Sequence, residues 1–414
     1  MKYKMRFGQN GVDFEPGINY EKLRRDRLAK VKKSMKEKGL GALVCYDFDN
    51  IRYITGTHIG EWCRNKMNRY CILAAEQEPH LFDPACPAKK TWATPWIADR
   101  VHPAVGSMRG AIPPEVGKVE EVAKEIKGYL QEFGVEDKPV GMDIVDIPLI
   151  RALEKEGIEV VDGQQAMIDA RIIKTSEEIE LLKTAAGMVD AAYEDIARAI
   201  KPGVKENELV AIANHTLYSM GSDLVECVNS ISGKRGQPHS HTFSNRFIRP
   251  GELIYLDIMH SYNGYRTCYY RTFICGKPTK EQVKAYETCY KWLYDSIEQV
   301  KPGNTTADVA AAWPSAEELG FSNEEEAFLL QFGHGIGMSI WEKPVISRLF
   351  SLDNPFELKE GMTFALETWC PSPDGNGAAR IEEEVVVTKD GCEIITKYPC
   401  DELISCGLPG CMVY

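Results

Sequence analysis

The chain has 414 residues, more than one hydrophobic core usually spans, so its length predicts two domains. Its net charge of -12 argues against a nucleic-acid or anionic-membrane partner, because both require a basic surface. No long apolar run and no apolar stretch behind the first six residues are present, which predicts neither a membrane span nor a signal peptide. We therefore expect a cytoplasmic protein. The 13 cysteines are scattered without CxxC pairs, which argues against a disulfide scaffold or a structural zinc site.

The first 170 residues alternate between helix and strand patterns. This alternation predicts an N-terminal α/β domain over residues 1–170. We expect helices over residues 20–38, 118–133 and 147–156, strands over 41–46, 70–74, 139–143 and 159–162, and a turn over 49–56.

A second domain is expected over residues 171–414. The sequence Thr175-Ser-Glu-Glu178 predicts a capping box that opens a long helix ending near Ile200. That helix is followed by Lys-Pro-Gly at 201–203, and a helix over 282–300 is followed by the same tripeptide at 301–303. This repeat predicts two similar halves related by a pseudo-twofold axis. Strands are expected over 254–258 and 265–274 in the first half and over 364–368 and 381–388 in the second.

Four polar residues in or beside apolar runs give the strongest functional signal. Asp257 lies within Ile-Tyr-Leu-Asp-Ile, and His334 lies within Gln-Phe-Gly-His-Gly-Ile-Gly, whose glycines would leave backbone room for a ligand. Glu367 follows an apolar stretch, and Glu382 lies in Ala-Arg-Ile-Glu-Glu-Glu. An unpaired charge is costly in such surroundings. Three carboxylates and one imidazole suit a hard or borderline divalent cation.

In the order and spacing of these motifs the chain resembles the creatinase/aminopeptidase P/prolidase family, whose catalytic domain has the pita-bread fold. The resemblance covers nearly the whole length, including Asp-Asn-Ile-Arg-Tyr-Ile-Thr-Gly at 49–56. It implies an α+β fold in which a creatinase-type α/β domain precedes a pita-bread catalytic domain. It also implies that Asp257, His334, Glu367 and Glu382 are metal ligands.

The chain departs from the family pattern at two positions. Cys268 stands eleven residues after Asp257, where the family has a second aspartate that bridges two metal ions. This leaves three alternatives: one divalent ion (zinc, ferrous iron or manganese) with the Cys268 thiolate as a ligand, a metal-free centre like that of creatinase, or a merely buried cysteine. Retention of Asp257 favours one ion. Trp341 stands where the metallopeptidases have a histidine, whereas His239 keeps the family's other substrate-facing histidine.

Further side chains are expected to contact the substrate. Trp341 offers a flat apolar wall for a small substrate or a cationic head group. Strand alternation places Glu384 on the same face as Glu382, and His241 lies beside His239. In the creatinase branch an arginine from the partner subunit's N-terminal domain binds the substrate carboxylate. The corresponding segment of this chain holds Trp62, Arg64 and Arg69, although solvated charge is the alternative for both arginines.

The leading hypothesis is a homodimeric C–N hydrolase of a small zwitterionic metabolite, with each N-terminal domain contributing to the partner's site. The metal or Glu367 would activate water, Glu382 would complete the catalytic centre, and His239 would deliver a proton. The alternatives are an Xaa-Pro dipeptidase with an altered metal site, a dimethylsulfoniopropionate-type lyase and a non-catalytic peptide-binding module. Retention of the histidines and glutamates argues against the module.

Overall fold

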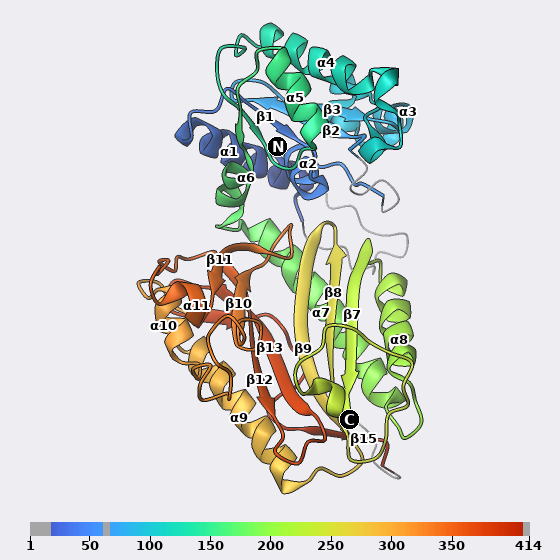
Figure 1. Ribbon diagram of the computed structural model, residues 1–414, viewed down its shortest axis with the longest axis vertical. Helices are drawn as coiled ribbons and strands as arrows, with labels where there is room; N and C mark the ends of the chain where they lie inside the picture. The colour runs from blue at the N-terminus through green and yellow to red at the C-terminus, as the bar shows by residue number, and fades with distance from the viewer. Residues whose placement is uncertain (1–17, 61–66, 409–414) are drawn as a thin grey trace.

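The structure, a computed structural model, describes residues 18–60 and 67–408. Figure 1 shows a smaller N-terminal part built around one sheet and a larger C-terminal part in which two sheets face each other, with long helices outside them. The expected α+β architecture is therefore confirmed. Among the described residues, no helix combines the length and the apolar character that crossing a bilayer requires.

The N-terminal part is built on a six-stranded sheet with strand order β4-β3-β2-β1-β5-β6. Its strands are β1 (Ala42–Cys45), β2 (Tyr70–Ala74), β3 (His80–Asp83), β4 (Val101–Pro103), β5 (Val140–Met142) and β6 (Val160–Asp162). Its helices are α1 (Tyr20–Glu37), α2 (Phe48–Thr55), α3 (Cys86–Ala88), α4 (Lys118–Glu132), α5 (Ile147–Lys155) and α6 (Gln164–Arg171). Short 3-10 or π turns lie at Lys89–Ala93, Pro95–Arg100, Met108–Gly110 and Pro114–Val116. The central strands β1 and β2 are buried along their whole length, as expected of a sheet covered on both faces.

One element of this part differs from the sequence-based expectation. Residues 49–56 were predicted to form a turn, but most of them belong to helix α2. The Asp47 side chain accepts hydrogen bonds from the backbone N–H groups of Asp49 and Asn50, which caps the start of the helix. Gly56, with φ of 73°, ends it in the left-handed conformation. Two local caps therefore stabilise a helix of only eight residues.

The C-terminal part contains two sheets, with strand orders β15-β9-β8-β7 and β11-β10-β12-β13-β14. The strands of the first are β7 (Leu224–Ser232), β8 (Leu253–Tyr262), β9 (Tyr265–Cys275) and β15 (Ile404–Cys406). Those of the second are β10 (Phe332–Gly335), β11 (Glu342–Ile346), β12 (Thr363–Pro371), β13 (Ala378–Val387) and β14 (Cys392–Ile394). The helices are α7 (Ser176–Ala199), α8 (Glu206–Ser219), α9 (Lys280–Ile297), α10 (Thr306–Ala311) and α11 (Arg348–Ser351), with a 3-10 turn at Gly233–Gly236.

The repeat expected from the sequence is present in the backbone. Helix α7 opens with the predicted capping box at Thr175, and each half then continues through a Lys-Pro-Gly turn into a shorter helix. Gly203 and Gly303 have φ of 90° and 91°, a conformation that glycine adopts without steric cost. Isolated bridges pair Lys205 with Phe247 in one half and Thr305 with Glu357 in the other. The pseudo-twofold arrangement is therefore confirmed.

The two sheets meet where β9 of the first half contacts β13 of the second (Figure 1). Thr272 Oγ1 donates to the backbone carbonyl of Arg380 at 2.6 Å, and Arg271 Nη2 lies 2.9 Å from Glu383 Oε2. Apolar clusters under α7 and α8 on one side, and under α9 on the other, support the two sheets from behind. The contact between β9 and β13 brings the polar residues of both halves to one place.

Candidate active site

Three of the five residues predicted as metal ligands lie together at this contact between the sheets, and Asp257 and Glu367 are not part of that group. One donor atom each from Cys268 on β9, His334 on β10 and Glu382 on β13 lies within 4.8 Å of the other two, and all three residues are buried. A thiol, an imidazole and a carboxylate form a mixed donor set that suits zinc or ferrous iron better than magnesium or calcium.

The local structure around His334 prepares its ring for ligation. Its Nδ1 lies 3.1 Å from the carbonyl oxygen of Gly335, and because a carbonyl only accepts, Nδ1 carries the proton and the lone pair is left on Nε2. Burial lowers the pKa of His334 to about 4, so the imidazole is neutral at neutral pH, as a metal ligand must be.

The glycines beside His334 have a different role from the expected one. A Cβ at Gly333 would lie 2.5 Å from the Leu366 side chain, and a Cβ at Gly335 would lie 2.4 Å from the carbonyl oxygen of Lys343. The glycines therefore let β10 pack closely between its neighbouring strands, rather than leaving space for a ligand.

Two buried glutamates of β13 retain oxygens without hydrogen-bond partners. Within the described residues, neither Glu382 Oε1 nor Glu384 Oε2 has one. Burial, reinforced by Glu367 and Asp257, raises the pKa of Glu382 well above its ordinary value, and burial raises that of Glu384 to about 8. The predicted alternation is confirmed: Glu384 Oε1 accepts from the backbone N–H of Cys268 on the site side, whereas Glu383 pairs with Arg271.

Asp257 and Glu367 have partners within the site. Asp257 Oδ2 accepts from Asn229 Nδ2 at 3.1 Å, and its Oδ1 lies 3.4 Å from the sulfur of Cys268. Glu367 Oε2 lies 2.6 Å from Arg380 Nη2. Burial nevertheless raises the pKa of Asp257, and it raises that of Glu367 to about 7.

The charge balance of this cluster fits a bound divalent cation. Four carboxyl groups are buried together, and in the described part of the chain Arg380 is the one cationic side chain that pairs with any of them. Uncompensated buried carboxylates must either take up protons or bind a cation. The unpartnered oxygen of Glu382 and the neutral ring of His334 favour binding of a cation. The four are Asp257, Glu367, Glu382 and Glu384.

Cys268 occupies the place at which the family has its bridging aspartate. Burial raises the pKa of its thiol well above the ordinary value, and the negative charge of Asp257 acts in the same direction. Its sulfur lies 3.4 Å from Asp257 Oδ1 and 3.9 Å from Glu382 Oε2. The thiol would thus lose its proton only to a cation bound beside it. With one sulfur in place of two carboxylate oxygens, the cluster fits one ion better than two.

Two tyrosines that were not predicted from the sequence position His239. Its Nδ1 lies 2.9 Å from the hydroxyl of Tyr255, and its Nε2 lies 2.9 Å from His241 Nε2 and 3.5 Å from the hydroxyl of Tyr270. Burial lowers the pKa of His239, and the charge of Arg380 lowers it further. Both tyrosines stand two positions from Asp257 or Cys268, so strand alternation could have indicated that they face the site.

The N-terminal residues expected at the substrate are placed differently. Trp62 and Arg64 lie outside the described residues. Arg69 is only 6% exposed, and its Nε lies 2.5 Å from Asp83 Oδ2 within the N-terminal sheet. This buried ion pair does not fit the prediction that Arg69 reaches a substrate, because its charge already has a partner. Trp341, by contrast, is 51% exposed.

The sequence profile of metallopeptidase family M24 matches residues 180–389, and that of the creatinase/prolidase N-terminal domain matches residues 27–173. The chain belongs to metallopeptidase family M24, as its motifs predicted. It is 28% identical over 376 residues to the Xaa-Pro dipeptidase of Lactobacillus delbrueckii subsp. lactis, covering 89% of this chain and 96% of that protein.

Solved structures show the same architecture. The dipeptidase PepE of Mycobacterium ulcerans superposes with a TM-score of 0.74 at 25% identity, covering 95% of this chain and 100% of that one. The prolidase of Thermococcus sibiricus superposes with a TM-score of 0.76 at 22% identity, covering 92% of this chain and 99% of that one. These likenesses support the two-part fold.

Proposed function

We propose that the protein hydrolyses a C–N bond in a small zwitterionic substrate, with one divalent cation held by Cys268, His334 and Glu382. The observation that carries this proposal is the convergence of their donor atoms within 4.8 Å, amid carboxylates that lack compensating charge. The names of the relatives, which are dipeptidases, support a peptidase-type hydrolase.

The side chains around the cation would have different roles in hydrolysis. A divalent cation in this position supplies Lewis acidity, which polarises a carbonyl oxygen and lowers the pKa of water. Glu367, whose pKa burial raises to about 7, can take a proton from water near neutral pH, and Arg380 fixes its orientation. Glu367 can then return that proton to the leaving nitrogen, while His239, held by Tyr255 and neutral because its pKa is lowered, can form a hydrogen bond with the substrate.

Two substrate classes are supported by different observations. Xaa-Pro dipeptides are favoured by the relative that matches 89% of the chain. A small metabolite is favoured by Trp341, because an indole ring stands where the family's peptidases have a histidine. Both substrates are zwitterions of similar size, so the choice between them depends on the space that the Trp341 side chain leaves for the substrate.

The test combines elemental analysis of the purified protein with a turnover screen of Gly-Pro, Ala-Pro, creatine and dimethylsulfoniopropionate. We expect one divalent ion per chain and release of proline or urea from one of the first three. The Glu367→Gln variant should abolish this turnover, and Glu393→Gln, which changes an exposed residue of β14, should not. Acrylate from the sulfonium substrate would establish the lyase instead. Unchanged turnover in Glu367→Gln would refute the assigned roles.

A further inference from the structure

Residues 337–342, which connect β10 to β11, carry Trp341 and lie against the N-terminal part. The ring of Trp341 stacks on the imidazole of His334, with centroids 5.6 Å apart and an angle of 10° between the ring planes. The position of this short segment therefore decides how the indole covers a predicted metal ligand. Three sets of contacts tie the segment to helix α2, far from it in sequence.

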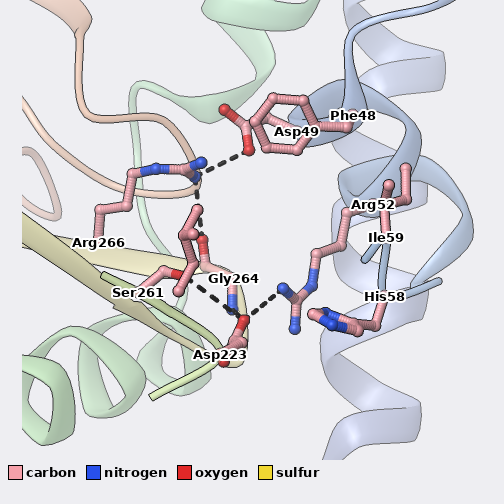
Figure 2. A pocket seen from close by; sticks show the side chains of 10 residues that line it. Phe48, Asp49, Arg52, His58, Ile59, Asp223, Ser261, Gly264 and Arg266 are labelled. Carbon is pink, nitrogen blue, oxygen red and sulfur yellow. Dashed lines mark hydrogen bonds and ion pairs between the residues drawn. The ribbon is translucent and has the colours of Figure 1, made fainter. Parts of the chain in front are cut away.

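The first contact set runs from Asp49 of α2 through Arg266 of β9. Arg266 Nη1 lies 2.8 Å from Asp49 Oδ1 and also donates to the carbonyl oxygen of Met338. The backbone N–H of Arg266 donates to the carbonyl oxygen of Gly337 at 2.8 Å. Figure 2 shows Arg266 and Asp49 facing each other across the interface between the two parts.

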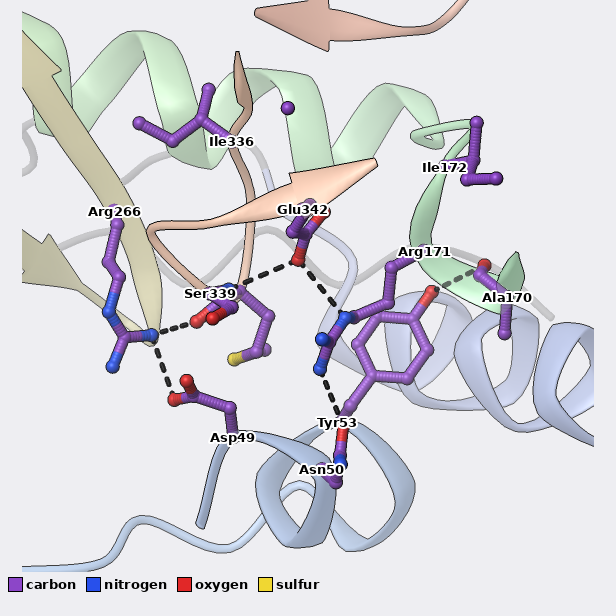
Figure 3. Close-up of polar contacts among 12 residues, drawn as sticks. Asp49, Asn50, Tyr53, Ala170, Arg171, Ile172, Arg266, Ile336, Ser339 and Glu342 are labelled. Atoms are coloured by element: carbon purple, nitrogen blue, oxygen red, sulfur yellow. Dashed lines mark hydrogen bonds and ion pairs between the residues drawn. The ribbon is translucent and has the colours of Figure 1, made fainter. Parts of the chain in front are cut away.

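The second contact set starts at the next residue of the same helix. Asn50 Oδ1 accepts from Arg171 Nη1 at 2.6 Å, and Arg171 Nε lies 3.1 Å from Glu342 Oε1. The same oxygen of Glu342 accepts from the backbone N–H of Ser339 at 3.1 Å, while its Oε2 lies 3.0 Å from Lys174 Nζ. Figure 3 shows the chain of contacts from α2 to the segment.

The third contact set is apolar. The side chain of Met338 is buried and belongs to the hydrophobic cluster that contains Ile51, Tyr53 and Ile54 of α2. Both polar sets are buried as well, and a buried charge that loses its partner is costly. The segment is therefore connected to α2 by two buried polar contact sets, and it shares an apolar cluster with that helix.

We propose that Asp49 and Asn50 are positioning residues that hold Trp341 over His334, so that the N-terminal part shapes the mouth of the same chain's active site. This inference rests on the proposed function for its kinetic consequence, but not for its structural one. It differs from the contribution expected from the sequence, in which the N-terminal domain reaches the site of a partner subunit.

The structural test measures the fluorescence of Trp341 as the difference between each protein and its Trp341→Phe counterpart. In Asp49→Asn the difference spectrum should shift to longer wavelength and become more sensitive to acrylamide, because the indole leaves His334. Asn50→Ala should shift the Trp341 spectrum in the same direction. This second variant keeps the test valid if Asp49→Asn folds poorly. Lys22→Gln is the matched control: its ion pair with Glu177, at 2.6 Å, also joins the N-terminal part to the C-terminal part, but it starts from α1 and lies outside both polar contact sets.

The kinetic test separates KM from kcat. Asp49→Asn should raise KM about threefold to tenfold with a smaller change in kcat, and it should add little once Trp341 has been changed to alanine, because coupled residues give non-additive effects. Lys22→Gln should leave both constants unchanged. An unaltered Trp341 spectrum in both variants, or additive effects on KM, would overturn the inference. If no substrate is turned over, the proposed function fails. The fluorescence result would still decide whether Asp49 and Asn50 position Trp341.

Discussion

Glu367 and Glu382 lie opposite each other in the β12–β13 ladder, yet their surroundings differ. Glu367 Oε2 lies 2.6 Å from Arg380 Nη2, and that guanidinium also lies 4.5 Å from the centre of the Tyr270 ring. Glu382 Oε1, in the described structure, has no hydrogen-bond partner. The charge of Glu367 is thus partly compensated by Arg380. The carboxylate of Glu382 has no such partner among the described residues, so a bound cation would have to compensate its charge.

This difference predicts separate effects of the two glutamates on metal affinity. Glu382→Gln should weaken cation binding by about 100-fold or more, since the loss of partners that merely support a ligand already costs about 10- to 100-fold. Glu367→Gln should abolish turnover with a smaller loss of cation affinity. Isothermal titration with zinc and manganese gives both values. Equal affinities in the two variants would remove the distinction drawn between them.

Cys268→Asp should raise the bound divalent metal from one toward two ions per chain, because it restores a carboxylate that can bridge. Cys268→Ser is the matched control, since it removes the thiol without adding charge and should leave no more than one ion. Elemental analysis after dialysis measures the ratio. An unchanged ratio in Cys268→Asp would mean that neighbours such as Asn229 close the second position.

The metal-free protein should lose stability as the pH rises. Burial raises the pKa of Glu367 to about 7 and that of Glu384 to about 8, above the ordinary value of 4.5. Above about pH 6.5, where the buried histidines with lowered pKa values are largely neutral in both states, the native state holds protons that the unfolded chain has already released. The free energy of unfolding should therefore fall from about pH 6.5 to pH 8, by up to about 1.4 kcal/mol per pH unit for each carboxyl group still titrating.

Thermal denaturation in a chelating buffer across that range would measure this slope. A bound divalent cation should flatten it, because the cation stabilises the ionised carboxylates. Glu384→Gln should also reduce the slope in the metal-free protein. A melting temperature that rises with pH between about 6.5 and 8 would contradict the assignment of raised pKa values to these carboxyls.

Arg69→Glu is expected to act on stability rather than on substrate binding. It would place a second carboxylate beside the fully buried Asp83, and breaking a buried ion pair typically costs about 3–5 kcal/mol. Arg151→Glu, which breaks an exposed pair with Glu154, should cost at most about 1 kcal/mol. Denaturant unfolding compares the two variants. Unchanged stability together with a raised KM would restore the substrate role predicted from the sequence.

Much of the fold follows from patterns that are local in sequence. The capping box at Thr175 and the repeated Lys-Pro-Gly turns predict where helices begin and end, and the apolar runs predict β8, β9, β12 and β13 but not the other strands of these two sheets. Helix α2 was missed because it is short and its stability depends on Asp47 and Gly56, which also suit a turn.

The site was only partly predictable, for a different reason. Strand alternation identified the face of β13 that carries Glu382 and Glu384, since that pattern is periodic. The pairing of Arg380 with Glu367, the contacts of His239 with Tyr255, and the burial of Arg69 all depend on side chains that meet only after folding. No spacing in the sequence specifies which of several possible partners such a side chain finds.

The proposed catalytic centre draws on both halves of the repeat, because β9 of one half contacts β13 of the other. Asp257 and Cys268 come from the first half, whereas His334, Glu367 and Glu382 come from the second. A chain cut in the exposed connection near Lys277 would yield fragments that each lack part of the ligand set. Activity would then be a property of fragment complementation, appearing only when the two pieces associate.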